Sequence, residues 1–147
     1  MSVREVSPVM EIREYCRYRE EEILRLYEAV GWKAYTADPD ALRRGFASSL
    51  LTLGAYEGDE LLGIIRLVGD GETVVFIQDV LVFPDRQRRG IGTALIKAAL
   101  KRYPRVRQIH LTADDTPAAL EFYRSLGFRD LGELACRGFM YMGPRGI

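Results

Sequence analysis

The chain has 147 residues, of which 48 % are hydrophobic, and this length suits one compact domain over residues 1–147 rather than two. Its 21 basic and 21 acidic residues cancel, so overall charge indicates neither a nucleic acid nor an anionic membrane as a partner. The charged N-terminus lacks the apolar core of a secretory signal, and no stretch reaches the roughly 20 apolar residues that a bilayer requires, so we expect a cytoplasmic protein.

The first half of the chain predicts a strand, two helices and three further strands. Val9 to Tyr15 alternates as a strand does, and Glu20 to Val30 has helical spacing of its apolar residues. Asp38 and Pro39 open a second helix, since proline is favoured at the first helical position. Apolar runs joined by tight turns then predict an antiparallel meander over residues 51–56, 61–68 and 73–83.

The second half alternates strands with helices. Apolar residues recur at three- and four-residue spacing from Gly90 to Arg102, which predicts a helix packed on the sheet. Residues 106–112 predict a strand. Thr116 as N-cap and Pro117 at the first helical position then start a helix that Gly127 ends.

Two short strands, at residues 128–131 and 138–141, are expected to close the sheet. The order of elements predicts an α+β fold with helices on both faces of a mixed sheet. Counted together, the predicted strands make a mostly antiparallel sheet of six to seven strands.

Cysteine usage gives no sign of metal or thiol chemistry. Cys16 and Cys136 lie far apart and have no metal-ligand spacing. We therefore expect reduced, buried thiols rather than a disulfide, and no metal site.

The stretch RQRRGIGTA, residues 86–94, places three arginines where a helix begins. A helix N-terminus carries partial positive charge and unpaired amides, so the arginines are unfavourable there unless an anion binds. No acidic residue follows Gly90 in the first turn, which favours a bound ligand as the source of negative charge. Gly90 and Gly92 allow phosphate oxygens to approach successive backbone amides, a geometry that suits a pyrophosphate.

Other interpretations of this loop are weaker. A P-loop does not fit because Gly-Lys-Ser/Thr is absent, and the dinucleotide fingerprint does not fit because Leu95 stands where its third glycine belongs. Gly90 as a simple turn residue beside solvated arginines is one alternative. A nucleic-acid binder that uses Arg86, Arg88 and Arg89 is another, but the basic patch is short and the charge balance neutral.

Two motifs of this chain resemble those of a known enzyme family. QDVLVFPDRQRRGIGTALI, residues 78–96, resembles motif A of the GNAT N-acetyltransferases, whose Gln/Arg-x-x-Gly-x-Gly/Ala pattern stands at residues 87–92. ALEFYRSLGF, residues 119–128, resembles motif B of that family. The resemblance implies the GNAT fold, acetyl-coenzyme A as cofactor, and transfer of an acetyl group to the primary amine of a small molecule such as a polyamine or arylalkylamine. Dimers are common in such families, so it also allows a homodimer.

By this resemblance, coenzyme A would bind along the third strand of the meander and the glycine loop. The backbone of Val80, Leu81 and Val82 would pair with its pantetheine arm. Arg88 or Arg89 would either reach the phosphates or remain solvated. Successive amides would hold the pyrophosphate: those of Gln87, Arg88, Arg89, Gly90, Ile91, Gly92 and Thr93.

Tyr123 is the candidate general acid. It shares a helix face with apolar residues, so its ring would pack inward while its hydroxyl reaches the cleft edge. In the family, the tyrosine of the matching Phe-Tyr pair commonly protonates the coenzyme A sulfur. The alternative is a core tyrosine whose hydroxyl only satisfies a hydrogen bond. Thr116 stands where many relatives have an asparagine, and we assign it no chemistry.

Asp79, inside the apolar run FIQDVLV, is the candidate base. A buried carboxylate must be hydrogen-bonded or have a perturbed pKa. In one interpretation Asp79 takes the proton of the amine through water. In another it braces a backbone bend or a neighbouring loop, and the amine loses its proton to solvent.

Trp32 and Tyr35 are the candidate acceptor-binding residues, because aromatic rings at the first two helices and their loop, Tyr15 included, can line an apolar or cation-binding wall. A core role is the alternative for each. GWKAYT and QDVLV are also similar to a subgroup that includes small bacterial and plant arylalkylamine acetyltransferases, which indicates a small primary amine. A non-catalytic module that binds or senses acyl-coenzyme A is the alternative to an enzyme.

Overall fold

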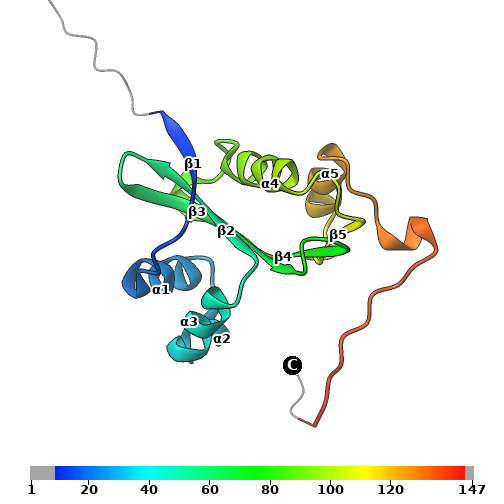
Figure 1. Ribbon diagram of the computed structural model, residues 1–147, viewed down its shortest axis with the longest axis horizontal. Coiled ribbons are helices and arrows are strands. Elements are labelled where there is room, and N and C mark those ends of the chain that lie inside the picture. The colour runs from blue at the N-terminus through cyan, green and yellow to red at the C-terminus, as the bar shows by residue number, and fades with distance from the viewer. Residues whose placement is uncertain (1–8, 145–147) are drawn as a thin grey trace, which may run out of the picture. The chain divides into compact units, whose positions relative to one another are not determined.

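The computed structural model describes residues 9–144. The chain divides into two compact units, Met1–Thr112 and Ala113–Ile147. The first unit contains the sheet and four of the helices, and the second contains one helix and a short 3-10 turn (Figure 1).

The sheet has five strands that follow one another in chain order (Figure 1). β1 to β4 are antiparallel neighbours, whereas β5 runs parallel to β4. A parallel pair needs a crossover, and helix α4 (Ile91–Arg102) provides it. The prediction of a mixed, mostly antiparallel sheet is confirmed. The strands are β1 (Met10–Glu14), β2 (Leu51–Glu57), β3 (Glu60–Gly69), β4 (Val74–Val82) and β5 (Gln108–Leu111).

The prediction of six to seven strands was wrong, because residues 128–131 and 138–141 form no strand. Asp130 accepts a hydrogen bond from the amide of Gly132 at 2.7 Å and caps a 3-10 helix, η2 (Leu131–Leu134), in place of a strand. This local bond competes with sheet pairing for the backbone. A short apolar run becomes a strand only where a neighbouring strand accepts its hydrogen bonds, and that requirement is not visible in the run itself.

Helix ends follow the predicted caps. Asp38 accepts from the amide of Ala41 at 3.1 Å and starts α3, and Thr116 accepts from the amide of Ala119 at 3.1 Å and starts α5. Gly127, with φ of +95°, follows the end of α5 as predicted. The single-turn helix α2 was not predicted, because four residues are too few for a periodic pattern. The remaining bounds are α1 (Glu20–Ala29), α2 (Lys33–Thr36), α3 (Pro39–Ala47), η1 (Pro84–Arg86) and α5 (Pro117–Ser125).

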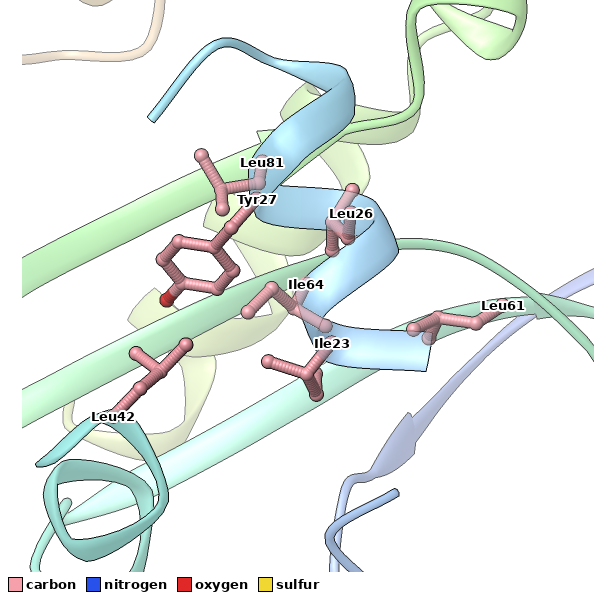
Figure 2. Close-up of a cluster of buried hydrophobic side chains, with 7 residues drawn as sticks. All are labelled: Ile23, Leu26, Tyr27, Leu42, Leu61, Ile64 and Leu81. Atoms are coloured by element: carbon pink, nitrogen blue, oxygen red, sulfur yellow. The ribbon is translucent and has the colours of Figure 1, made fainter. Parts of the chain in front are cut away.

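In the first unit, α1 and α3 cover one face of the sheet. Their apolar stripes meet side chains of β3 and β4 in a buried cluster that Figure 2 shows. Helix α4 packs on the opposite face, where Ala99 and Leu100 lie against Leu67 and Ile77. The buried members of the first cluster are Ile23, Leu26, Tyr27, Leu42, Leu61, Ile64 and Leu81.

A β-bulge in β4 moves the side chains on its two sides to opposite faces of the sheet. Arg66 of β3 pairs with Asp79, and the next residue, Leu67, pairs with Ile77, so Gln78 is the extra residue. Without a bulge, Ile77 and Asp79 would lie on one face, because strand side chains alternate. With it, Ile77 faces α4, while Asp79 contacts Tyr27 of α1 on the other face. The bulge therefore brings a carboxylate beneath the N-terminal helices.

Residues 9–144 contain neither a helix that could span a membrane nor a cluster of metal-ligand side chains. Each helix there is too short or too polar to cross a membrane, and no three His, Cys, Asp or Glu side chains come together as a metal site requires. Cys16 and Cys136 are free thiols, but the prediction that they are buried was wrong, since both are exposed. Cys16 follows the edge strand β1 and Cys136 follows η2, so neither belongs to the core face of an element.

Gly63 of β3 lies against β4 with no room for a side chain. A Cβ there would stand 2.5 Å from the carbonyl oxygen of Leu81 and 3.1 Å from Cα of Val82. Because backbone must move to relieve this overlap, we expect Gly63→Ala to cost about 2 kcal/mol and to lower Tm by about 6 °C in thermal unfolding followed by circular dichroism. Gly138→Ala is the control, since its Cβ meets no atom within 4 Å. Equal Tm values for the two variants would contradict the prediction.

Candidate active site

The segment between β4 and α4 presents a run of unpaired backbone amides. Its first part is bonded back on itself, as the amide of Arg86 donates to Phe83 O at 2.8 Å and that of Gln87 to Pro84 O at 3.4 Å. From Arg88 to Thr93, no acceptor among the described residues takes an amide hydrogen. The first helical bond of α4 comes after them, from Ala94 to Gly90 O.

Two left-handed residues shape this run. Arg88 has φ of +66° and Gly90 has φ of +76°, with Arg89 between them. Alternation of this kind turns successive amides toward one concave point, a nest that binds anions. The left-handed conformation costs a non-glycine residue roughly 1 kcal/mol, and such strain is concentrated at functional sites. Gly90 is required for its φ, since a Cβ there would meet no atom within 4 Å.

The three arginines of the loop have different roles. Arg86 is paired, with Nη2 2.8 Å from Oε1 of Glu60 and Nη1 4.0 Å from Oε1 of Glu57. Arg88 and Arg89 are exposed and form no ion pair with the part of the chain that is described. The first turn of α4 contains no acidic residue either. Two unpaired guanidinium groups therefore lie beside the unpaired amides, a donor set that fits a phosphate or pyrophosphate.

One edge of β4 is open next to this nest. The pairing of β4 with β5 stops at Ile77↔Leu111, so residues 78–82 have no strand on that side within residues 9–144. The amide of Phe83 donates to Leu62 O on β3, and backbone groups alternate in direction along a strand. Val80 and Val82 therefore point to the open edge, whereas the backbone of Leu81 points to β3.

Gln87 ties the loop to that edge. Its Nε2 donates to the carbonyl oxygen of Val82 at 3.2 Å. The sequence assigned Gln87 only an amide contact with a pyrophosphate. The structure shows that its amide is bonded to Pro84 O and that its side chain occupies one acceptor of the β4 edge. Of the three residues predicted to pair with the pantetheine arm, Leu81 points to β3 and Val82 accepts the bond from Gln87. Only the backbone groups of Val80 therefore face the open edge without a bond to Gln87.

Trp32 and Tyr35 form a stacked pair with ring centroids 5.7 Å apart and an interplanar angle of 30°. Their exposed fractions are 37 % and 36 %, and both contact the buried ring of Tyr27, at centroid distances of 6.1 and 5.5 Å. Gln78 Nε2 of β4 lies 3.4 Å from the hydroxyl of Tyr35. The pair is therefore a partly exposed aromatic wall that contacts β4.

Asp79 is 1 % exposed and belongs to an ion pair. Its Oδ2 accepts from Nε of Arg66 at 2.6 Å and from the hydroxyl of Tyr27 at 2.5 Å. Burial, followed by the negative charge of Asp79, raises the pKa of Tyr27 well above its usual range. These contacts fit the bracing interpretation, and the role of Asp79 as a proton acceptor stays a prediction.

Sequence reasoning did not assign Arg66 and Tyr27 to this site. A signal for Arg66 was present, because an arginine inside ELLGIIRLVG needs a buried partner, and VVFIQDVLV offers one. No local signal was present for Tyr27, which reads as an ordinary core residue of α1.

Tyr123 lies in the second unit, on α5. Its half-buried ring packs edge-on against Phe122 and Phe128, with centroid distances of 5.0 and 5.8 Å. Burial, and then the negative charge of Asp114, raises the pKa of Tyr123 above its ordinary value. The hydroxyl therefore keeps its proton at neutral pH, as a general acid must.

Comparison with protein families identifies the class. Residues 14–128 match the model described as the acetyltransferase (GNAT) family, and the chain belongs to this family. The GNAT family protein SP0256 of Streptococcus pneumoniae TIGR4 is 36 % identical and superposes with a TM-score of 0.84 over 93 % of this chain and 100 % of that one. The resemblance of the two motifs is thereby confirmed.

Two other relatives are informative. The uncharacterized N-acetyltransferase ycf52 of Gracilaria tenuistipitata var. liui is 30 % identical over 111 residues, which are 73 % of this chain and 60 % of the relative. The chain spans about three fifths of the length of such curated relatives. The PaiA N-acetyltransferase of Thermoplasma acidophilum, solved in complex with coenzyme A, is 18 % identical with a TM-score of 0.65 over 82 % of this chain and 90 % of that one, and shares the fold.

Proposed function

We propose that this chain is an N-acetyltransferase that uses acetyl-coenzyme A and acetylates the primary amine of a small molecule. The observation that carries the proposal is the nest of unpaired amides from Arg88 to Thr93 at the start of α4. It is an anion site with two unpaired arginines beside it, next to an open strand edge. Membership of the GNAT family supports this chemistry.

The chain would hold the cofactor through backbone groups. The amides from Arg88 to Thr93 would bind the pyrophosphate, and the guanidinium groups of Arg88 and Arg89 would balance its charge. The backbone of Val80 would pair with the pantetheine arm, and that of Val82 would do so if the side chain of Gln87 released its carbonyl oxygen. When bound, acetyl-coenzyme A supplies an activated acetyl thioester.

Tyr123 would be the proton donor. Because its pKa is raised by burial, Oη remains protonated at neutral pH and can give its proton to the leaving sulfur. The amine must be neutral to attack, and its proton is taken by solvent water or, as the sequence predicts, by Asp79. Trp32 and Tyr35 would hold the acceptor, since their exposed faces suit an apolar or cationic body.

Thiol release tests the proposed activity. Purified protein is mixed with acetyl-coenzyme A and with spermidine or tryptamine as acceptor, and free thiol is measured with a chromogenic disulfide. We expect release above the hydrolysis background with at least one of the two amines. Tight binding of acetyl-coenzyme A without release for either amine would contradict the proposed acceptor class and favour the non-catalytic binding module.

The cellular location and assembly of the chain stay predictions. A single domain over residues 1–147, a homodimer and a cytoplasmic site are what the sequence and the family resemblance favour. Light scattering during size-exclusion chromatography measures the mass of the assembly, and twice the 16.7 kDa of one chain would support the dimer.

A further inference from the structure

A buried polar network joins β3, β4 and α1. Oδ2 of Asp79 accepts from Nε of Arg66 and from the hydroxyl of Tyr27, and Nη1 of Arg66 donates to Oγ of Ser49 at 3.1 Å. Arg66 is 6 % exposed, Asp79 1 % and Tyr27 0 %. The three side chains at the centre of the network are therefore buried in the interior of the first unit.

Stability alone does not account for this network. Moving two charges out of water is costly, and a buried ion pair often stabilises a fold no better than apolar side chains of similar volume. Here the carboxylate is also incompletely bonded, because Oδ1 of Asp79 is buried and has no hydrogen-bond partner among residues 9–144. The network does fix the relative positions of its side chains, since the Tyr27 hydroxyl and Arg66 Nε both donate to Oδ2 of Asp79.

The group held by this geometry is the aromatic wall. The ring of Tyr27 contacts the rings of both Trp32 and Tyr35. The bond from the Tyr27 hydroxyl to Asp79 therefore holds in place the ring on which the other two pack. Tyr35 is held a second time by Nε2 of Gln78. Gln78 and Asp79 are consecutive residues, and the bulge lets Gln78 contact Tyr35 of α2 and Asp79 contact Tyr27 of α1.

We propose that Asp79 is a positioning residue for the acceptor amine. Its bond to Tyr27 sets the distance between β4 and the aromatic wall of Trp32 and Tyr35. The open edge of β4 begins at the bulge that also places Asp79. This inference rests on the proposed function, because β4 would carry the pantetheine arm. Loosening the bond should weaken binding of an amine whose apolar or cationic body lies on the wall, while the nest continues to bind acetyl-coenzyme A.

Tyr27→Phe is the test variant, since it removes the hydroxyl and keeps the ring. Tyr18→Phe is the matched control. Tyr18 also packs in this region, with its ring centroid 5.1 Å from that of Phe46, but its hydroxyl has no hydrogen-bond partner among the described residues. Asp79→Asn is the second variant.

Trp32 gives a readout that needs no acceptor, because it is the single tryptophan of the chain. Acrylamide quenching of its fluorescence reports how tightly the wall is held. The other measurements are KM and kcat for spermidine or tryptamine, whichever turns over, and the Kd of acetyl-coenzyme A by calorimetry.

We expect Tyr27→Phe to raise the quenching constant of Trp32 and to raise the acceptor KM about tenfold, the scale of one hydrogen bond to a charged group. Its Kd for acetyl-coenzyme A should stay at the wild-type value, and Tyr18→Phe should match the wild type throughout. Wild-type quenching and KM in Tyr27→Phe would overturn the proposal, as would the same shift in both tyrosine variants. If Asp79→Asn lowered kcat without changing KM, the carboxylate would act on the proton rather than on position.

Failure of the proposed function is distinguishable from failure of this inference. If neither amine is acetylated, the proposed acceptor class is wrong and the quenching comparison alone decides the positioning role. If an amine is acetylated but Tyr27→Phe leaves quenching and KM unchanged, the function stands and the positioning role falls.

Discussion

The Gly92→Glu variant is expected to bind acetyl-coenzyme A about 100-fold more weakly than the wild type, a loss of about 2.7 kcal/mol. Gly92 lies in the first turn of α4, where amides have no helical acceptor and no acidic side chain is present. A glutamate there would place its carboxylate at the helix N-terminus and occupy the position proposed for the pyrophosphate. Calorimetric titration of acetyl-coenzyme A into both proteins measures the difference.

The same substitution should not unfold the protein. An acidic side chain in the first turn is favourable for a helix, so the unliganded variant should keep or slightly raise its Tm. Lys97→Gln makes the same change of one unit in net charge on the exposed face of α4 and should bind as the wild type does. Undiminished binding by Gly92→Glu would contradict the nest, and no binding by the wild type would remove the common basis of the enzyme and the binding-module hypotheses.

Tyr123→Phe is expected to lower kcat about 100-fold, the scale of a lost general acid, while the Kd of acetyl-coenzyme A stays within about twofold. The phenyl ring keeps the packing against Phe122 and Phe128, so only the proton donor is removed. Kinetics of thiol release with the amine that turns over measure kcat. Tyr141→Phe is the control, because Tyr141 lies in the same unit and is 85 % exposed.

The pH dependence of the wild type should agree with this role. A raised pKa means that Tyr123 loses its proton only above the ordinary value of about 10, so the decline of kcat due to this group should begin above that pH. The decline should be absent from Tyr123→Phe. Turnover by Tyr123→Phe at the wild-type rate would show that another group protonates the leaving sulfur.

Elements defined by short-range chemistry could be predicted from the sequence. Asp38 and Thr116 were expected as N-caps and are N-caps, because each bonds an amide three residues away. The helix α1 followed from the spacing of its apolar residues, and the meander from tight turns between apolar runs. The strands at 128–131 and 138–141 were predicted wrongly because a strand depends on a neighbour that the run does not specify.

The glycine loop also combines features that the sequence predicted with features that only the structure shows. The sequence predicted an anion site at residues 86–94 from glycines, arginines and the missing acid, all local features. It did not separate Arg86, which pairs with acids of β2 and β3, from Arg88 and Arg89, which do not. The left-handed conformation of Arg88 was also not predicted, because few residues other than glycine adopt it.

By itself, the sequence determined the family and the helix caps, and it predicted an anion site at residues 86–94, since these features depend on residues close together in the chain. Only the tertiary structure decided that Gln78 is a bulge, that Asp79 therefore turns to Arg66 and Tyr27, and that β5 leaves one edge of β4 open. Strand alternation alone places Gln78 and Asp79 on opposite faces. The pairing of β4 with β3 brings Gln78 to α2 and Asp79 to α1, because register is set by two strands together.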